Sequence, residues 1–228
     1  MKKKSILVAG LSVMIIASMA IAGTLAYFTD NKTATNTFTV GNVAIKLDEA
    51  KVNKDGDEWV EDTTVARVTE NEYDNVYPGA VLPKDPTVTL NSGSSDAYVR
   101  VKVTVSNAAA WKAACANPAH NITDLTTIFK GYTSGNWNLA NEPAIDTTND
   151  TLTYIYNYIG GEKGGRLSAG QKTGPLFTSV KIPDTFTNTE MEAIGAKVGD
   201  DTGFKMTIVA EAIQAEGFTS VTDAFAKF

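Results

Sequence analysis

The stretch AYVRVKVTV, from Ala97 to Val105, alternates between two kinds of side chain over most of its length. A period of two residues places successive side chains on opposite faces of a β-strand. One face of this strand carries Val99, Val101, Val103 and Val105. The other face carries Tyr98, Arg100, Lys102 and Thr104. We therefore expect a half-buried antiparallel strand with its valine face in a core.

Similar patterns on both sides of this strand predict further strands. These cover Thr87–Leu90, Thr151–Ile159, Leu176–Ile182 and Phe204–Ala215. The polar residues 91–95 form a loose turn in this interpretation, so Thr87–Leu90 is expected to make a hairpin with the valine strand.

The run from Phe38 to Leu47 is also strand-like and begins the folded part of the chain. Its apolar residues change parity at Gly41-Asn42, from Phe38 and Val40 to Val43, Ile45 and Leu47. An extra residue at such a change is the signature of a β-bulge, which would restore one apolar face on both sides.

Short helices are expected in the connections. Asn107 and Asp124 are placed to cap two of them. The stretch TNTE, from Thr187 to Glu190, fits a capping box that opens a third. A fourth has its apolar stripe at Phe218, Val221, Phe225 and Phe228. Strands dominate and no βαβ alternation is visible, so we predict an all-β fold: an antiparallel β-sandwich with short helical insertions.

The first 26 residues have the pattern of a secretion signal. Three lysines precede an uncharged, largely apolar run that ends near Ala26. Thr24 and Ala26 place small residues at the two positions that a signal peptidase reads, so cleavage is expected before Tyr27. A retained membrane anchor is the alternative, since about 20 apolar residues span a bilayer. Cleavage is favoured because no cationic stop-transfer flank follows.

Composition excludes several classes of function. The chain carries a formal net charge of −6, and loss of the three leading lysines makes it more acidic. An acidic secreted domain is a poor candidate for binding nucleic acid or anionic membranes. Cys115 is the only cysteine and His120 the only histidine, so neither an internal disulfide nor a His-rich zinc site can be built. His120 lies in the polar stretch NPAHN and is expected to be a solvent-exposed loop residue.

No motif predicts a catalytic residue, cofactor or metal site. The charged residues 48–64 invite a calcium-loop interpretation, but Lys51 stands where an EF-type loop needs a carboxylate, and a solvated hairpin or loop is favoured. Tyr154, Tyr156 and Tyr158 line one face of a predicted strand. They are a candidate sugar-stacking platform, although packing is the favoured interpretation.

The signal junction carries a family resemblance. The segments GTLAYFTD (23–30) and TFTVGNV (37–43) resemble the TasA/camelysin family of secreted biofilm-fibre proteins, and weaker matches occur at residues 77–79, 84–86, 97–100 and 211–215. The resemblance implies a jelly-roll sandwich, release by a SipW-type signal peptidase and polymerisation into extracellular fibres. Camelysin itself carries a metallopeptidase label, but no residues here match a zinc site, so this activity is not expected.

In that family the mature N-terminal segment is thought to complete the sheet of a neighbouring copy. The implied organisation is a signal peptide (1–26), a donor segment (27–36) and a single sandwich domain (37–228). The candidate assembly residues are Tyr27, Phe28, Thr29 and Asp30. Unpaired sandwich edges attract strands, and head-to-tail donation does not close on itself. Pairing of residues 27–36 within their own subunit is the open alternative.

We therefore expect a secreted structural subunit of biofilm-matrix fibres, located in the extracellular matrix or at the cell surface. Its expected partners are further copies of itself, a SipW-type signal peptidase and minor fibre or anchoring proteins, with membrane contact only before cleavage. A camelysin-type secreted metalloendopeptidase, and a surface adhesin or carbohydrate-binding module, are the alternatives.

Overall fold

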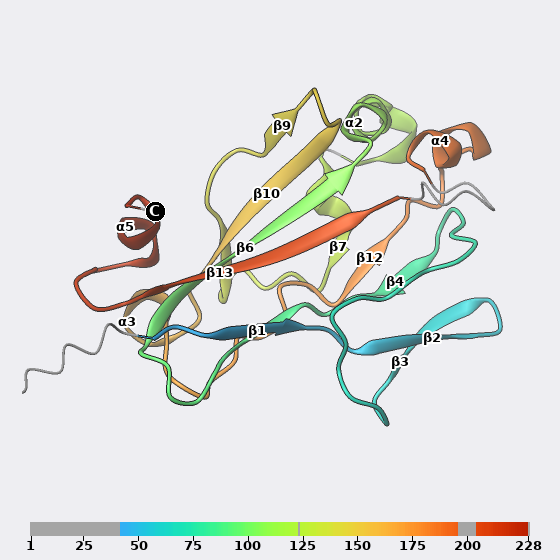
Figure 1. Cartoon of the computed structure of the whole chain (residues 1–228). Coiled ribbons are helices and arrows are strands. Elements are labelled where there is room, and N and C mark those ends of the chain that lie inside the picture. The colour runs from blue at the N-terminus through green and yellow to red at the C-terminus, as the bar shows by residue number, and fades with distance from the viewer. Residues whose placement is uncertain (1–41, 123, 196–203, 228) are drawn as a thin grey trace, which may run out of the picture. The chain divides into compact units, whose positions relative to one another are not determined.

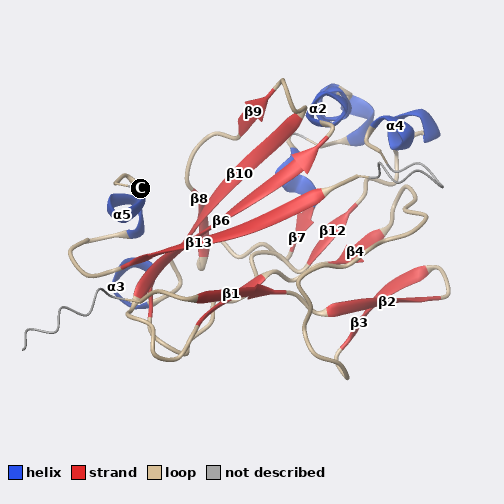
Figure 2. Ribbon diagram, viewed as in Figure 1, coloured by secondary structure: helices blue, strands red, loops and turns tan. Residues whose placement is uncertain are grey.

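A computed structural model describes residues 42–122, 124–195 and 204–227, all within one unit of the chain, Gly41–Phe228. This unit is an all-β sandwich of antiparallel sheets with short helices in the connections (Figures 1 and 2). The fold class predicted from the alternating patterns is confirmed.

The larger sheet is built around the valine strand. Strand β6 (Ala97–Ser106) lies between β13 (Met206–Gln214) and β10 (Thr151–Tyr158). The outer side of β10 pairs with β8 (Trp137–Leu139) and β9 (Ala144–Asp146), and the short β11 (Arg166–Leu167) pairs with the start of β6. The four valines of β6 are at most 1% exposed, so the predicted valine face is the core face.

The opposite layer is made of two smaller sheets. Strand β1 (Ile45–Asp48) pairs with β5 (Thr87–Leu90). Strand β12 (Ser179–Lys181) lies between β4 (Val81–Pro83) and β7 (Phe129–Lys130).

The predicted hairpin between Thr87–Leu90 and the valine strand is wrong. Residues 91–95 carry the chain from one layer of the sandwich to the other, and β5 pairs with β1 instead. On its other side, β5 bonds to the segment around Gln171, whose carbonyl accepts from Leu90 N at 2.9 Å. Val88 and Leu90 are fully buried. Burial between layers overrode the local turn pattern.

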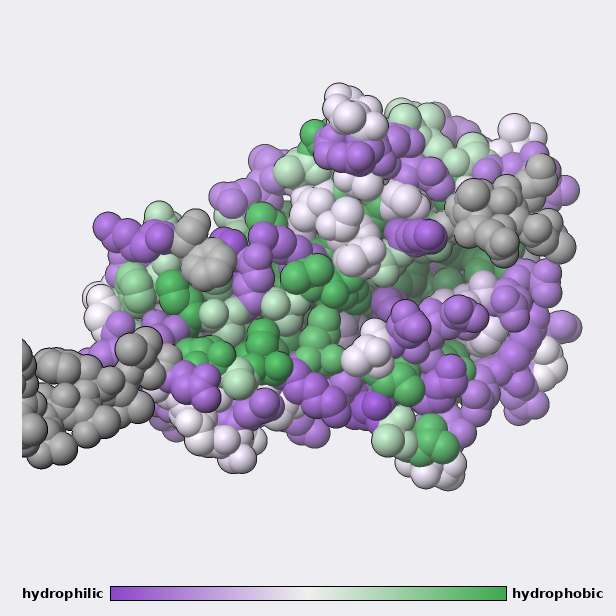
Figure 3. All heavy atoms as spheres, in the orientation of Figure 1, coloured by the Kyte–Doolittle hydropathy of each residue, from purple (hydrophilic) through white to green (hydrophobic). Residues whose placement is uncertain are grey.

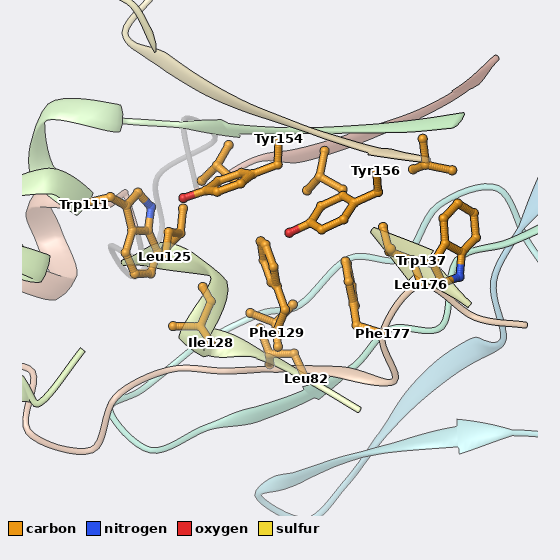
Figure 4. Close-up of a cluster of buried hydrophobic side chains, with 14 of the residues drawn as sticks. Leu82, Trp111, Leu125, Ile128, Phe129, Trp137, Tyr154, Tyr156, Leu176 and Phe177 are labelled. Atoms are coloured by element: carbon orange, nitrogen blue, oxygen red, sulfur yellow. The ribbon is translucent and has the colours of Figure 1, made fainter. Parts of the chain in front are cut away.

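Aromatic side chains fill the core between the layers (Figure 4). The rings of Phe129 and Phe177 stack with centroids 4.9 Å apart, and Phe129 meets Tyr154 edge-on at 5.9 Å. Tyr154, Tyr156 and Tyr158 are 2%, 3% and 6% exposed. The packing interpretation of these tyrosines is therefore confirmed, and they offer no surface on which a sugar could stack.

The charged residues after β1 form a hairpin, as favoured. Strands β2 (Lys51–Asp55) and β3 (Glu58–Asp62) pair across a turn in which Gly56 has φ 62°. Most of this hairpin is exposed to solvent.

The helices are short. They are α2 (Ala108–Ala116), η2 (Pro118–His120), η3 (Leu125–Ile128), α3 (Glu162–Gly165), α4 (Asn188–Ala193) and α5 (Val221–Phe225). The predicted capping box of Thr187 and Glu190 is present on α4, and the Asp124 side chain caps η3. In the part of the chain that the structure describes, no helix has the length and apolar character needed to cross a membrane.

Two predictions around α2 are wrong. Asn107 precedes the helix with left-handed backbone but makes no side-chain cap, because its amide donates to the carbonyl of Ile194 at 2.8 Å. His120 is 7% exposed instead of being a solvated loop residue. Its ring packs edge-on against Phe186 at 4.8 Å, and Nε2 lies 2.7 Å from Glu190 Oε1.

Candidate strand-acceptor site

Strand β13 forms an edge of the larger sheet, and its hydrogen-bonding phase can be fixed from its two ends. Ser106 N donates to Lys205 O at 3.0 Å, and Ala215 N donates to Asp96 O at 2.8 Å. Antiparallel pairs alternate between bonded and non-bonded residues, so the odd-numbered residues of β13 bond to β6. The even-numbered residues therefore present N–H and C=O groups at the outer edge: Met206, Ile208, Ala210, Ala212 and Gln214. Among the described residues, none pairs with this edge.

The side chains of these even-numbered residues lie on the core-facing side of β13. Met206, Ile208, Ala210 and Ala212 pack against the main core but are only half-buried. Full burial of one large aliphatic side chain contributes about 1.5–3 kcal/mol relative to leaving it exposed. A strand added at this edge would therefore gain both hydrogen bonds and apolar contact.

Strand β1 has a second edge with which no strand in the described ranges pairs. Asn91 N donates to Ala44 O and Ser95 N to Asn42 O, both at 2.9 Å, so the even-numbered residues bond on the β5 side. The odd-numbered residues face the other way and carry half-buried apolar side chains, at Val43, Ile45 and Leu47. Just past β1, Glu49 does have a partner on this side among the described residues: its backbone exchanges two hydrogen bonds of 2.8 Å with the backbone of Val68.

These two edges border one open side of the sandwich. Some Cα atoms of β1 lie within 8 Å of Cα atoms of β13, yet no ladder joins the two strands in the described residues. In the space-filling view, apolar side chains gather between them on the face turned to the reader (Figure 3). We call the edges of β13 and β1, with the apolar side chains between them, the open side.

Charged side chains hold β13 in register from its outer face. Glu211 accepts from Lys102 Nζ at 2.6 Å and from Arg100 Nε, both on β6. Burial alone would raise the pKa of Glu211, but these hydrogen bonds outweigh it and place the pKa below its ordinary value. Strand β13 is thus anchored to β6 on one side, and on its other side no described strand pairs with it.

The predicted site residues Thr24, Ala26, Tyr27, Phe28, Thr29 and Asp30 all lie outside the described residues. The sequence pattern predicted a donor segment, residues 27–36, but did not predict that β13 would be the acceptor edge. A signal was present in FKMTIVAEAIQA (204–215), where apolar or small residues occupy nearly every position. Such a pattern does not tell an edge strand from a central one, because pairing depends on residues far away in sequence.

The described residues do not fit a zinc ion. No group of three or more His, Cys, Asp or Glu side chains converges in the described ranges. His120 is already bonded on both ring nitrogens, with Nδ1 2.9 Å from Thr185 Oγ1 and Nε2 2.7 Å from Glu190. Glu190 accepts from Thr187 as well, and these bonds lower its pKa to about 2.

Fold and site together define a β-sandwich protein in which the described residues leave one partly apolar side without a paired strand. Residues 1–148 match the family model described as camelysin metallo-endopeptidase. The chain belongs to this family, which is the TasA/camelysin family that the signal junction resembled. No curated protein and no solved structure matches the chain.

Proposed function

We propose that this protein is a secreted structural subunit of extracellular fibres, assembled by strand donation. The observation that carries the proposal is the open side, where hydrogen-bonding groups of β13 and β1 have no partner among the described residues and lie beside half-buried apolar side chains. Exposed edges of this kind are templates for another chain, and native proteins usually cover or blunt them.

The donor in this proposal is the N-terminal segment of another copy. An extended segment adds a strand through main-chain hydrogen bonds, and alternate side chains fill pockets. Residues 27–36 supply Phe28 for such a pocket. Because the donor and acceptor surfaces differ, each copy can give to one neighbour and receive from the next, which makes an open filament.

Export fits the same proposal. Before cleavage, the signal peptide holds the donor segment at the membrane, and release before Tyr27 by a SipW-type signal peptidase frees it. The further partners would be other copies of the chain and minor fibre or anchoring proteins, in the extracellular matrix or at the cell surface.

The test compares the mature protein, which begins at Tyr27, with a version that lacks residues 27–36. Electron microscopy and sedimentation should show filaments for the mature protein and monomers for the shortened one, with matching circular dichroism spectra. Identical filaments from both proteins would exclude strand donation. A mature protein that stays monomeric at high concentration would exclude the fibre itself.

The family description favours a second candidate, a secreted metalloendopeptidase. Casein digestion by the purified mature protein with added zinc, and its loss on chelation, would support this activity. The described residues do not fit a zinc site, so we prefer the structural role. That the chain is not an enzyme stays a prediction. The assay uses the whole mature protein, so it also tests the residues that the structure does not describe.

An adhesin that stacks sugars on the tyrosines has no support from the fold, because the three side chains are buried. Replacing Tyr156 by alanine would also remove a core ring, which typically costs about 3–5 kcal/mol. Loss of glycan binding in such a variant would therefore report unfolding as readily as a lost contact.

A further inference from the structure

Glu49 lies directly after β1 and carries a buried carboxylate with two side-chain partners. The residue is only 4% exposed. Its Oε2 accepts from Lys84 Nζ at 2.6 Å, and its Oε1 accepts from Asn71 Nδ2 at 3.0 Å. One carboxylate therefore holds an amine on one oxygen and a primary amide on the other.

The amine of Lys84 is shielded from water as well. Its side chain is 12% exposed and that of Glu49 is 5% exposed. Buried charges are costly, and transfer of one proton from Lys84 to Glu49 removes both charges of the pair at once. The product is a neutral amine, which has the free electron pair that a nucleophile needs.

The amide of Asn71 is held in one orientation by three partners. Besides the bond to Glu49, its Nδ2 donates to Ala50 O at 2.8 Å, and its Oδ1 accepts from Val52 N at 2.8 Å. Two acceptors face the amide nitrogen and one donor faces the amide oxygen, so a flipped amide would lose these bonds. The N–H of Val52 therefore points at the oxygen that becomes negative when a nucleophile attacks Cγ of Asn71.

Tyr73 fixes the chain between the amide and the amine. Its hydroxyl donates to the carbonyl of Pro83, the residue directly before Lys84. Its ring meets Trp59 edge-on, with the centroids 5.1 Å apart. Burial, together with the nearby charge of Glu49, raises the pKa of Tyr73, so the hydroxyl keeps its proton. Such fixing reduces the entropy that is lost when two groups on one chain react.

We propose that Lys84 and Asn71 join in an isopeptide bond between Nζ and Cγ, with Glu49 as the proton carrier. The Nζ–Cγ bond forms and the Cγ–Nδ2 bond breaks. Two protons leave Nζ and pass through Glu49 to Nδ2, which departs as ammonium and leaves Glu49 a carboxylate again. The flexible four-carbon stem of the lysine lets Nζ move from the carboxylate to Cγ.

The bond gives the chain a covalent brace that needs no pair of cysteines. Cys115 is the only cysteine, so a disulfide within one chain is not available. A cross-link between Asn71 and Lys84 restricts the unfolded chain in the same way as a disulfide. The brace forms within a single copy, so this inference does not depend on the proposed function.

Mass spectrometry of the denatured mature protein tests the bond, because denaturant separates an ion pair but not an amide. We expect a mass that is one ammonia below the mass of the sequence. Trypsin should not cut after Lys84, so residues 68–100 should appear as one peptide that is lighter by the same amount. Lys102 is the internal control. It also donates to a carboxylate at 2.6 Å, that of Glu211, which accepts from Arg100 as well, and trypsin should cut after it.

Two substitutions identify the reacting groups. Lys84→Arg keeps a positive donor for Glu49 but removes the nucleophile. Glu49→Gln keeps the size of the side chain but removes the group that accepts protons. We expect both variants to have the full mass of their sequences, with circular dichroism spectra that match the natural protein.

The natural protein alone can overturn the bond, so the test stands even where a substitution prevents folding. A full sequence mass after prolonged incubation, with trypsin cutting after Lys84, would exclude the cross-link. An ammonia loss that persists in Lys84→Arg would also exclude it, because an asparagine that closes on its own backbone loses ammonia too. An ammonia loss that persists in folded Glu49→Gln would exclude Glu49 as the proton carrier.

Discussion

At the scale of single residues, the side-chain caps of α4 and η3 were predictable from the sequence, and the burial of His120 was not. Thr187 and Glu190 form the predicted capping box because both partners lie within four residues of each other. His120 was predicted wrongly because its surroundings come from Thr185, Phe186 and Glu190, more than 60 residues away. A polar sequence neighbourhood carries no information about such partners.

Arg67 joins two carboxylates, those of Asp48 at the end of β1 and of Asp85 just ahead of β5. Its guanidinium donates to Asp48 and Asp85 at 2.6 Å, and Asp48 is 7% exposed. Burial by itself raises the pKa of Asp48, but hydrogen bonds from Lys46 and Arg67 bring the net pKa below the ordinary value.

We expect Arg67→Ala to lower the free energy of unfolding by about 2 kcal/mol, because it leaves a buried carboxylate with fewer partners. Partial exposure of the Arg67 side chain keeps the loss below that of a fully buried pair. Lys46→Ala is the control, since the Lys46 side chain is 58% exposed, and it should cost less than about 1 kcal/mol when both variants are unfolded by urea. Equal losses of unfolding free energy in the two variants would contradict the view that Arg67 is the main partner of the buried Asp48 carboxylate.

Glu190 gives a prediction for pH. Bonds from the Thr187 backbone, His120 and the Thr187 hydroxyl lower its pKa to about 2, against about 4.3 in an unfolded chain. A lowered carboxyl pKa stabilises the fold above the unfolded pKa, and this contribution is lost as pH falls through the folded pKa. The stability advantage of the natural protein over Glu190→Gln should therefore shrink between about pH 5 and pH 2.

Chemical denaturation at a series of pH values measures that difference. Glu192→Gln is the control, because Glu192 lies exposed on the same helix. A gap between the natural protein and Glu190→Gln that stays constant across the acid range would mean that the capping carboxylate does not keep its low pKa.

At the scale of elements, periodicity identified strands but not their partners. The valine strand and FKMTIVAEAIQA both became long strands, β6 and β13. Their pairing, and the position of β13 at an edge, could not be predicted, because nothing in a strand pattern states how many neighbours it has. The hairpin predicted for Thr87–Leu90 failed for the same reason, since β5 found its partner 40 residues earlier in the chain.

Proline can block the free edge of β13 without disturbing its pairing with β6. Ala210 directs its N–H to the open side, whereas Val209 directs its N–H to β6. Proline lacks this donor and is tolerated on edge strands where the missing N–H would face outward. We expect Ala210→Pro to keep a folded monomer and to lose filament formation.

Val209→Pro is the matched comparison for this substitution. It removes a ladder bond to β6 and should lower the free energy of unfolding by on the order of 1–3 kcal/mol. Thermal unfolding and electron microscopy of both variants separate the two effects. Normal filaments from Ala210→Pro would show that the β13 edge receives no strand.

At the scale of the whole molecule, one core unites the two layers, and the donor segment is expected to add nothing to it. Chains that begin at residue 27 and at residue 37 should therefore unfold with midpoints that agree within a few degrees, each in one cooperative transition. The measurement uses monomer at low concentration, because assembly of the longer chain would stabilise it by mass action. A markedly lower midpoint for the shorter chain would place residues 27–36 within their own subunit.

The sequence by itself determined the long strands, most of the predicted helix caps, the all-β class and the family, because these depend on periodicity and on residues close together in the chain. Only the tertiary structure decided which strands pair, that His120 is buried and which strand edges have no partner among the described residues. These properties arise from contacts between distant segments, where packing of the core outweighs local preference. The edges of β13 and β1, which no described strand pairs with, belong to this second group, because a strand lies at an edge only as a result of how the other strands pair.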